Sequence, residues 1–136
     1  MRLLVTGSRT ISPQESETVR RVLNEVQAAD ILRFGHREIT VVQGECPYGG
    51  VDLIAERWAD ETEHAQSEGH PADWDGLGKA AGPIRNSYMV SLGADMCLAF
   101  PVAWSRGTWD CIRKAVDAGI PTHIYPLHKT AEDGAR

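Results

Sequence analysis

The chain has 136 residues, of which 42% are hydrophobic and 24% are charged. This length and composition predict one soluble globular domain with enough apolar surface to form a core without disulfides or a metal. Fourteen lysines and arginines against nineteen acidic residues leave a formal charge of −5, which disfavours sequence-independent binding to nucleic acid.

Cellular location is indicated by hydropathy and by the cysteines. No apolar run approaches the length of a membrane span, so no membrane partner is expected. Cys46, Cys97 and Cys111 are odd in number and widely spaced, and they form no CxxC pair. This pattern argues against a disulfide framework and favours a cytoplasmic protein. The five histidines lack the spacing of metal ligands, so neither a metal nor a cofactor is expected.

Strand and helix patterns alternate along the chain. Apolar or β-branched runs predict strands at residues 2–6, 38–43, 64–66, 96–100 and 121–125. Amphipathic segments predict helices at residues 13–29, 50–61, 83–92 and 108–118. Ser12, Pro13 and Glu15 predict a capping box at the start of the first helix, and Gly119 is expected to end the last one. Residues 30–37 and most of 62–82 are expected to be loops.

This alternation predicts an α/β fold, a Rossmann-like three-layer sandwich around a mostly parallel five-stranded sheet of order 3-2-1-4-5. Residues 1–126 are expected to form the domain and residues 127–136 a polar C-terminal tail. In such a sheet, ligands bind at the carboxyl edge where the winding reverses, here between the first and fourth strands.

Three predicted strands end in glycine-containing turns that should meet at this edge. Their residues include Gly7, Ser8, Arg9, Gly44, Gly49, Gly50, Ser105, Arg106, Gly107 and Thr108. A turn that opens a helix directs free N–H groups and the positive end of the helix dipole at one point, which suits a phosphate. One such turn alone favours an ordinary strand-to-helix connection, but three on one edge favour a shared site for a nucleotide-like ligand.

Several side chains have two possible roles. Arg9 and Arg106 either donate hydrogen bonds to phosphate oxygens or are solvated surface arginines. Asp52 either complements the dipole of the second helix or accepts ribose hydroxyls. Trp74 either stacks on a base or covers core.

Two familiar phosphate motifs are absent. GECPYGG imitates a P-loop but has Gly50 and Val51 where lysine and serine or threonine are required, and there is no GxGxxG. Neither an ATPase nor an ordinary NAD dehydrogenase is expected.

Longer segments of the chain resemble the SLOG superfamily, specifically its YspA-like branch. These segments are LLVTGSR, QGECPYGGVDLIAERWA, HPADWDGLGKAAGPIRNSYM and SRGTWDCIRKAVDAGIP. The resemblance implies a Rossmann-like domain that binds nucleotides or nucleotide-derived signals such as ADP-ribose derivatives. It also implies a relationship to the lonely-guy phosphoribohydrolases, once labelled lysine decarboxylases, which cleave the N-glycosidic bond of nucleoside monophosphates with an arginine and a glutamate.

By similarity, Arg85 matches the arginine of those enzymes, and residues 105–108 match their GGxGT turn. The pattern GTxxE would place glutamate at Cys111, and the nearest carboxylate, Asp110, is one residue early. One residue is a rotation of about 100° on a helix, so Asp110 should face elsewhere. A thiol cannot replace the carboxylate in glycoside cleavage.

The preferred hypothesis is therefore a module that binds a nucleotide-like small molecule without turnover. One alternative is an N-glycosidase of the lonely-guy type, in which Arg85 and Asp110 act as catalytic residues. A second alternative is a protein-interaction module whose glycine turns are purely structural. A homodimer is expected, since relatives often pair through helices.

Overall fold

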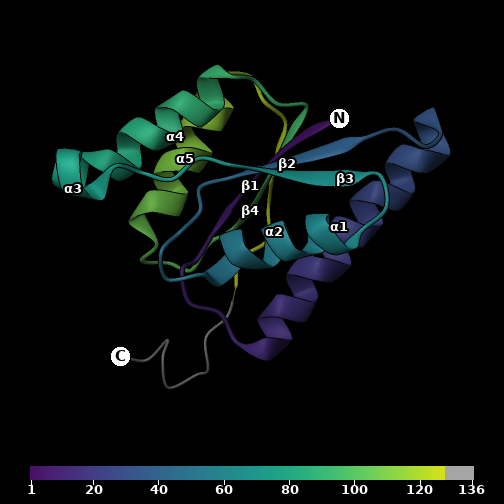
Figure 1. Cartoon of the computed structure of the whole chain (residues 1–136), viewed down its shortest axis with the longest axis horizontal. Helices are drawn as coiled ribbons and strands as arrows, with labels where there is room; N and C mark the ends of the chain where they lie inside the picture. The colour runs from purple at the N-terminus through teal and green to yellow at the C-terminus, as the bar shows by residue number, and fades with distance from the viewer. Residues whose placement is uncertain (128–136) are drawn as a thin grey trace.

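The computed structural model describes residues 1–127 and arranges them as helices, a parallel sheet and helices in three layers (Figure 1). The strands are β1 (Arg2–Gly7), β2 (Ile39–Gln43), β3 (Ala65–Gly69), β4 (Met96–Phe100) and β5 (Thr122–Ile124). The helices are α1 (Pro13–Phe34), α2 (Gly50–Glu61), α3 (Trp74–Leu77), α4 (Ala81–Ser91) and α5 (Arg106–Asp117), with one 3₁₀ turn, η1 (Gly78–Ala80).

The strand order is β3-β2-β1-β4-β5, and every neighbouring pair is parallel, which confirms the predicted Rossmann-like topology. Helices α1 and α2 cover one face of the sheet, and α4 and α5 cover the other (Figure 1). Alternate residues of β1 supply both cores, because Leu3 and Val5 pack with the α1 and α2 side chains while Leu4 packs with those of α4 and α5. The strands therefore all end at one edge.

Helix α1 begins as predicted but is longer than expected. Ser12 Oγ accepts the Glu15 N–H at 3.1 Å, and the Ser12 N–H donates to Glu15 Oε1 at 2.8 Å, which confirms the capping box. The prediction that the helix ends near Ala29 was wrong, since it continues to Phe34. Gly35, with a φ of 74°, forms the C-cap instead. The first five residues of the expected 30–37 loop are thus helical.

Strand β3 is longer than the three residues predicted for it. It runs from Ala65 to Gly69, while His64 lies outside it with a φ of 62°. Its sequence, AQSEG, has little strand character, but all five residues pair with β2. The expected loop after it contains α3 and η1, and α4 begins two residues before Pro83.

The last elements differ from the predictions by a few residues. Helix α5 begins at Arg106 rather than Thr108, and Gly119, with a φ of 78°, follows its C-cap as predicted. Strand β5 is shorter than the predicted 121–125. Leu127 was assigned to the polar tail, but it is buried and its N–H donates to Pro101 O at 2.8 Å. The rest of the predicted tail, residues 128–136, lies outside the described residues.

Candidate functional site

The first glycine turn contacts the start of α2 directly. Gly50 has a φ of 63°, and a Cβ on it would overlap the backbone of Ser8 and Arg9. The Val51 N–H donates to Ser8 O at 3.0 Å, and the Ser8 N–H donates to Phe100 O at 3.0 Å. The end of β1, the start of α2 and the end of β4 therefore meet at the carboxyl edge. The packing of these backbone segments therefore requires glycine at position 50, with or without a ligand.

The second glycine turn contacts α4 through Arg85. Arg85 Nη1 donates to Gly44 O at 2.5 Å and to His70 O at 3.4 Å, while its Nε donates to Asn86 Oδ1 at 2.9 Å. A Cβ on Gly44 would occupy the space of this guanidinium. Within residues 1–127, Arg85 Nη2 has no hydrogen-bond partner, so two N–H groups of a cation remain available at this edge.

Asn86 connects Arg85 to the third glycine turn. Its buried side chain donates from Nδ2 to Gly107 O and to Asp110 Oδ2, both at 3.1 Å. It also accepts the bond from Arg85 described above. One amide thus holds α4 and the first turn of α5 together. Sequence reasoning did not identify Asn86, although its place beside Arg85 in the middle of a helix is unusual for a polar residue.

The third glycine turn contains two backbone donors without an acceptor in residues 1–127. At the start of α5, the Arg106 N–H donates to the Trp104 carbonyl and the Trp109 N–H donates to the Ser105 carbonyl, each at 3.0 Å. The N–H groups of Gly107 and Thr108 have no acceptor within the described part of the chain. Ser105 does not cap them, because its Oγ instead accepts the Val102 N–H at 3.3 Å. Two amide donors therefore lie at the positive end of the helix dipole.

Asp52 is buried beneath the second glycine turn. Its Oδ2 accepts the Cys46 N–H at 3.2 Å. Burial raises the pKa of Asp52 to about 6, against the opposing effects of the Arg85 charge and of backbone hydrogen bonds from Cys46 and Gly44. The carboxylate thus organises the 44–49 loop from the first turn of α2.

Three further predicted ligand contacts lie on the surface. Arg9 is exposed, and its guanidinium lies 5.0 Å from the centre of the Tyr48 ring, so it links the first and second turns. Tyr48, itself exposed, was not identified from the sequence. Trp74, in α3, packs its ring edge toward Gly82 in the first turn of α4. Arg106 is exposed beside Gly107.

Asp110 is occupied by protein partners. Its Oδ1 accepts from Arg113 at 2.8 Å, and its Oδ2 accepts from Lys114 at 2.9 Å in addition to Asn86. Burial acts to raise the pKa of Asp110, but the bonds from Lys114 and Asn86 and the nearby charges outweigh it, so the pKa is lowered. Cys111 is fully buried, and burial raises its pKa to about 11. The thiol at the position of the expected glutamate is therefore un-ionised at neutral pH.

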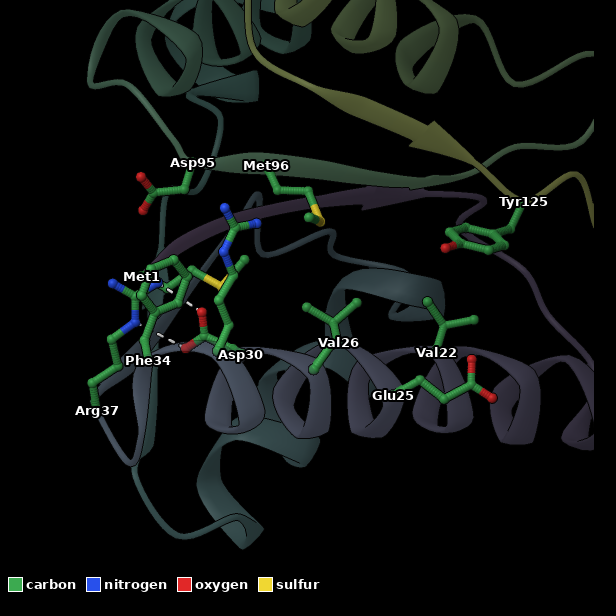
Figure 2. A pocket seen from close by; sticks show the side chains of 12 residues that line it. Met1, Val22, Glu25, Val26, Asp30, Phe34, Arg37, Asp95, Met96 and Tyr125 are labelled. Atoms are coloured by element: carbon green, nitrogen blue, oxygen red, sulfur yellow. Dashed lines mark hydrogen bonds and ion pairs between the residues drawn. The ribbon is translucent and has the colours of Figure 1, made fainter.

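A hollow of about 460 Å³ lies at the opposite edge of the sheet, between α1 and the start of β4 (Figure 2). Val22, Val26 and Met96 line it, and the ion pair of Arg37 with Asp30 lies at its rim. Glu25 and Asp95 also belong to its lining. Three carboxylates line the hollow against two arginines and the N-terminal ammonium of Met1, so it has no excess of positive charge for an anionic ligand, and the candidate site remains at the carboxyl edge.

Residues 1–127 contain neither a candidate membrane span nor a candidate metal cluster. None of the helices there combines the length and the apolar character that crossing a bilayer requires. In the same residues, no three His, Cys, Asp or Glu side chains are grouped in a way that could hold a metal ion. The cytoplasmic location and the homodimer stay predictions.

A parallel sheet of this order, with glycine turns gathered at its carboxyl edge, defines a Rossmann-like protein. Residues 1–76 match the YspA, cpYpsA-related SLOG family (YAcAr). The chain is also 44% identical over 124 residues to the Gene 61 protein of Mycobacterium phage D29, an alignment covering 88% of this chain and 92% of the relative. The chain belongs to the YspA, cpYpsA-related SLOG family, which confirms the resemblance inferred from its sequence. No solved structure matches it significantly.

Proposed function

We propose that this protein binds a nucleotide-derived ligand, of the ADP-ribose or nucleoside monophosphate class, at the carboxyl edge of the sheet. The phosphate lies against the N–H groups of Gly107 and Thr108 and the free face of Arg85. Arg9 and Arg106 add positive charge at the rim, and Asp52 and Trp74 are the candidate contacts for the sugar and the base. Membership of the SLOG family supports a nucleotide-related ligand.

Gly107 is the observation that carries the proposal. A Cβ on Gly107 would meet no heavy atom within 4 Å, and its φ is not in the left-handed region. Every other glycine in residues 1–127 has a positive φ or would crowd a neighbour with a Cβ. The fold therefore gives no reason for glycine at this position. A ligand that must approach the backbone closely does give one.

The electrostatic setting also favours an anion. A chain with a net charge of −5 attracts phosphate only where local donors outweigh its overall field. Arg85 supplies a full positive charge, and the first turn of α5 adds roughly half a charge. These two elements are tied together by Asn86, so their donors are held in place before any ligand arrives.

The test is Gly107→Asp, compared with the wild type by differential scanning fluorimetry and calorimetry against AMP, ADP-ribose and NAD. Aspartate in the first turn of a helix is favourable and removes a flexible glycine, so we expect unchanged or higher thermal stability. The same carboxylate repels phosphate, so we expect nucleotide binding to weaken by at least about tenfold.

Gln14→Asp is the matched control, because Gln14 is the exposed second residue of α1 as Gly107 is of α5. It should gain the same favourable interaction with the helix dipole and leave binding unchanged. The proposal fails if no nucleotide binds the wild type, or if Gly107→Asp binds as tightly as the wild type does.

A further inference from the structure

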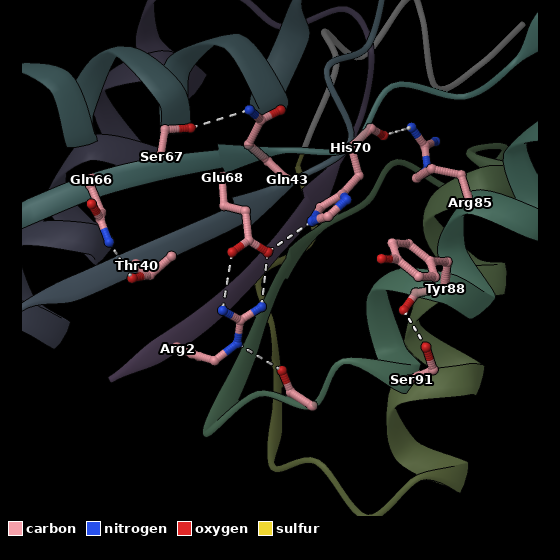
Figure 3. Close-up of polar contacts among 11 residues, drawn as sticks. Arg2, Thr40, Gln43, Gln66, Ser67, Glu68, His70, Arg85, Tyr88 and Ser91 are labelled. Carbon is pink, nitrogen blue, oxygen red and sulfur yellow. Dashed lines mark hydrogen bonds and ion pairs between the residues drawn. The ribbon is translucent and has the colours of Figure 1, made fainter.

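A polar cluster lies on the α4 face of the sheet, beside the candidate site (Figure 3). It consists of Arg2 on β1, Glu68 on β3, His70 just after β3 and Tyr88 on α4. Arg2 reaches past β2 and donates to both Glu68 oxygens, at 3.2 and 2.9 Å, while its Nε donates to Gly93 O at 3.2 Å. This fork fixes the position of the Glu68 carboxylate.

Glu68 in turn determines which nitrogen of His70 carries the proton. Its Oε2 lies 2.8 Å from His70 Nε2. The hydrogen bonds from Arg2 and then from His70 lower the pKa of Glu68 to about 2, so at neutral pH Glu68 has no proton to donate. The bond therefore requires an Nε2–H donor on His70. In the neutral ring, Nδ1 is then the nitrogen with a free lone pair.

The backbone of His70 lies against Arg85. The His70 N–H donates to Gln43 O at 2.9 Å, which extends the β2–β3 pairing by one residue. The His70 carbonyl accepts from Arg85 Nη1, as described above. The Tyr88 ring packs against the imidazole edge-on, with 5.5 Å between ring centres (Figure 3).

The lone pair of Nδ1 is accessible and unused. The His70 side chain is 18% exposed. Within residues 1–127, no donor bonds to Nδ1, and Nδ1 points away from Glu68 because the two ring nitrogens face nearly opposite ways. A partly buried acceptor of this kind normally has a partner. Nδ1 is therefore open to a partner from outside the described residues, a water or a ligand group.

We propose that His70 is a specificity-determining residue of the nucleotide site, whose Nδ1 accepts a hydrogen bond from a hydroxyl or amino group of the ligand held by Arg85. This inference rests on the function proposed above. A ribose hydroxyl and the adenine amino group share the required donor chemistry, and a fully ionised anion such as sulfate lacks it. Glu68 and Arg2 are positioning residues that hold the ring and its tautomer.

The tautomer can be tested without a ligand. The ¹⁵N NMR spectrum of the imidazoles in the full chain, assigned with His70→Asn, should show the proton of the neutral His70 ring on Nε2. In Glu68→Ala this preference should weaken, because the carboxylate that selects it is gone. A wild-type ring with its proton on Nδ1 overturns the proposal.

Binding is tested by calorimetry with ADP-ribose, AMP and sulfate. In His70→Ala we expect ADP-ribose and AMP to bind about three- to tenfold more weakly, since one hydrogen bond is lost. His70→Asn should retain most of the affinity, because its amide oxygen takes the place of Nδ1. Sulfate binding should be unchanged in both variants and weakened in Arg85→Ala.

Analogues then identify the donor. If a ribose hydroxyl is the donor, 2′- or 3′-deoxy-AMP should bind the wild type and His70→Ala equally well. If the adenine amino group is the donor, IMP, which lacks it, should bind the wild type and His70→Ala equally well.

The outcomes separate the two proposals. Weaker nucleotide binding in Arg85→Ala together with unchanged binding in His70→Ala overturns the role of His70 and leaves the proposed function in place. Failure of every nucleotide to bind the wild type overturns both.

Discussion

Arg85 Nη1 lies 2.5 Å from the carbonyl oxygen of Gly44, in space that a Cβ on Gly44 would fill. The contact is charge-assisted, and it fixes the guanidinium between the loop after β2 and the carbonyl of His70. Gly44 thus serves the placement of Arg85, whereas Gly50 serves the packing of two backbone segments. Glycines that look alike in the sequence have different physical purposes in the fold.

Gly44→Ala and Gly50→Ala should therefore have different effects on stability. The new Cβ at residue 44 meets the flexible end of Arg85, which can move aside, so we expect a loss of about 1 kcal/mol in the free energy of unfolding. The new Cβ at residue 50 meets rigid backbone at a positive φ, so we expect a loss of about 2–4 kcal/mol. Urea denaturation measures both.

A double-mutant cycle isolates the Gly44–Arg85 contact. Once Gly44→Ala has displaced the guanidinium, Arg85→Ala should remove little more stability, so the two losses should not add. Additive losses would contradict the contact.

Asp52 gives the stability of the protein a distinct pH dependence. Its pKa is about 6 in the folded state and near 3.8 in the unfolded chain, because burial disfavours its charged form. The folded state therefore binds the proton more tightly. The stability from this group is fully present below about pH 4 and is lost as the pH rises through 6, by about 3 kcal/mol in all.

Asp52→Asn removes this titration. Urea denaturation between pH 4 and 8 should show a falling free energy of unfolding in the wild type and a flatter profile in the variant. Glu68, whose lowered pKa contributes stability that is lost as the pH falls from about 4.5 toward 2, acts only at the acidic end of this window and with the opposite sign. An equally steep profile in Asp52→Asn would show that another group is responsible.

The strand order could be predicted from the sequence because it follows from local signals and general chain topology. Apolar runs alternate with capped helices, and right-handed crossovers leave few arrangements of five parallel strands. The end of α1 could not be predicted from periodicity, since Leu32 and Phe34 are apolar yet exposed and do not extend the buried stripe. The length of β3 was underestimated because the strand is stabilised by its pairing with β2 and its own residues have low strand propensity.

The candidate site was predictable only in part. Topology alone brings Gly7, Gly44 and Gly107 to one edge, because parallel strands end together. The roles of Asn86 and of the Arg2–Glu68–His70 chain depend on how α4 is rotated and on a contact that passes over an intervening strand. Such relationships connect residues far apart in the sequence and leave no local pattern.

Arg37→Ala should destabilise the protein through the group it leaves behind. Asp30 has a side chain only 6% exposed, and both of its oxygens accept from Arg37, at 2.9 and 2.7 Å. The hydrogen bond from Arg37 lowers the pKa of Asp30, so the pair stabilises the fold above the unfolded pKa of 3.8 and loses this effect as the pH falls through the lowered value. At pH 7 we expect a loss of about 1–3 kcal/mol on removing the arginine.

A double-mutant cycle with Asp30→Ala removes the carboxylate that Arg37→Ala leaves buried and unpaired. Arg37→Ala combined with Asp30→Ala should be more stable than Arg37→Ala alone, because no unpaired charge remains buried. Chemical denaturation of the three variants measures this. A double variant that is no more stable than Arg37→Ala would mean that Asp30 is well solvated without its partner.

Asp110→Ala separates binding from hydrolysis. A carboxylate that stabilises or protonates a glycosidic bond must face the substrate, whereas both oxygens of Asp110 are engaged by Asn86, Lys114 and Arg113. We therefore expect the variant to lose about 1–2 kcal/mol of stability. Mass spectrometry should find no ribose 5-phosphate above the enzyme-free rate from AMP with the wild type or with Asp110→Ala. Release of ribose 5-phosphate by the wild type, abolished in Asp110→Ala, would reverse the choice between binding and cleavage, because it would require Asp110 to leave its partners when the nucleotide binds.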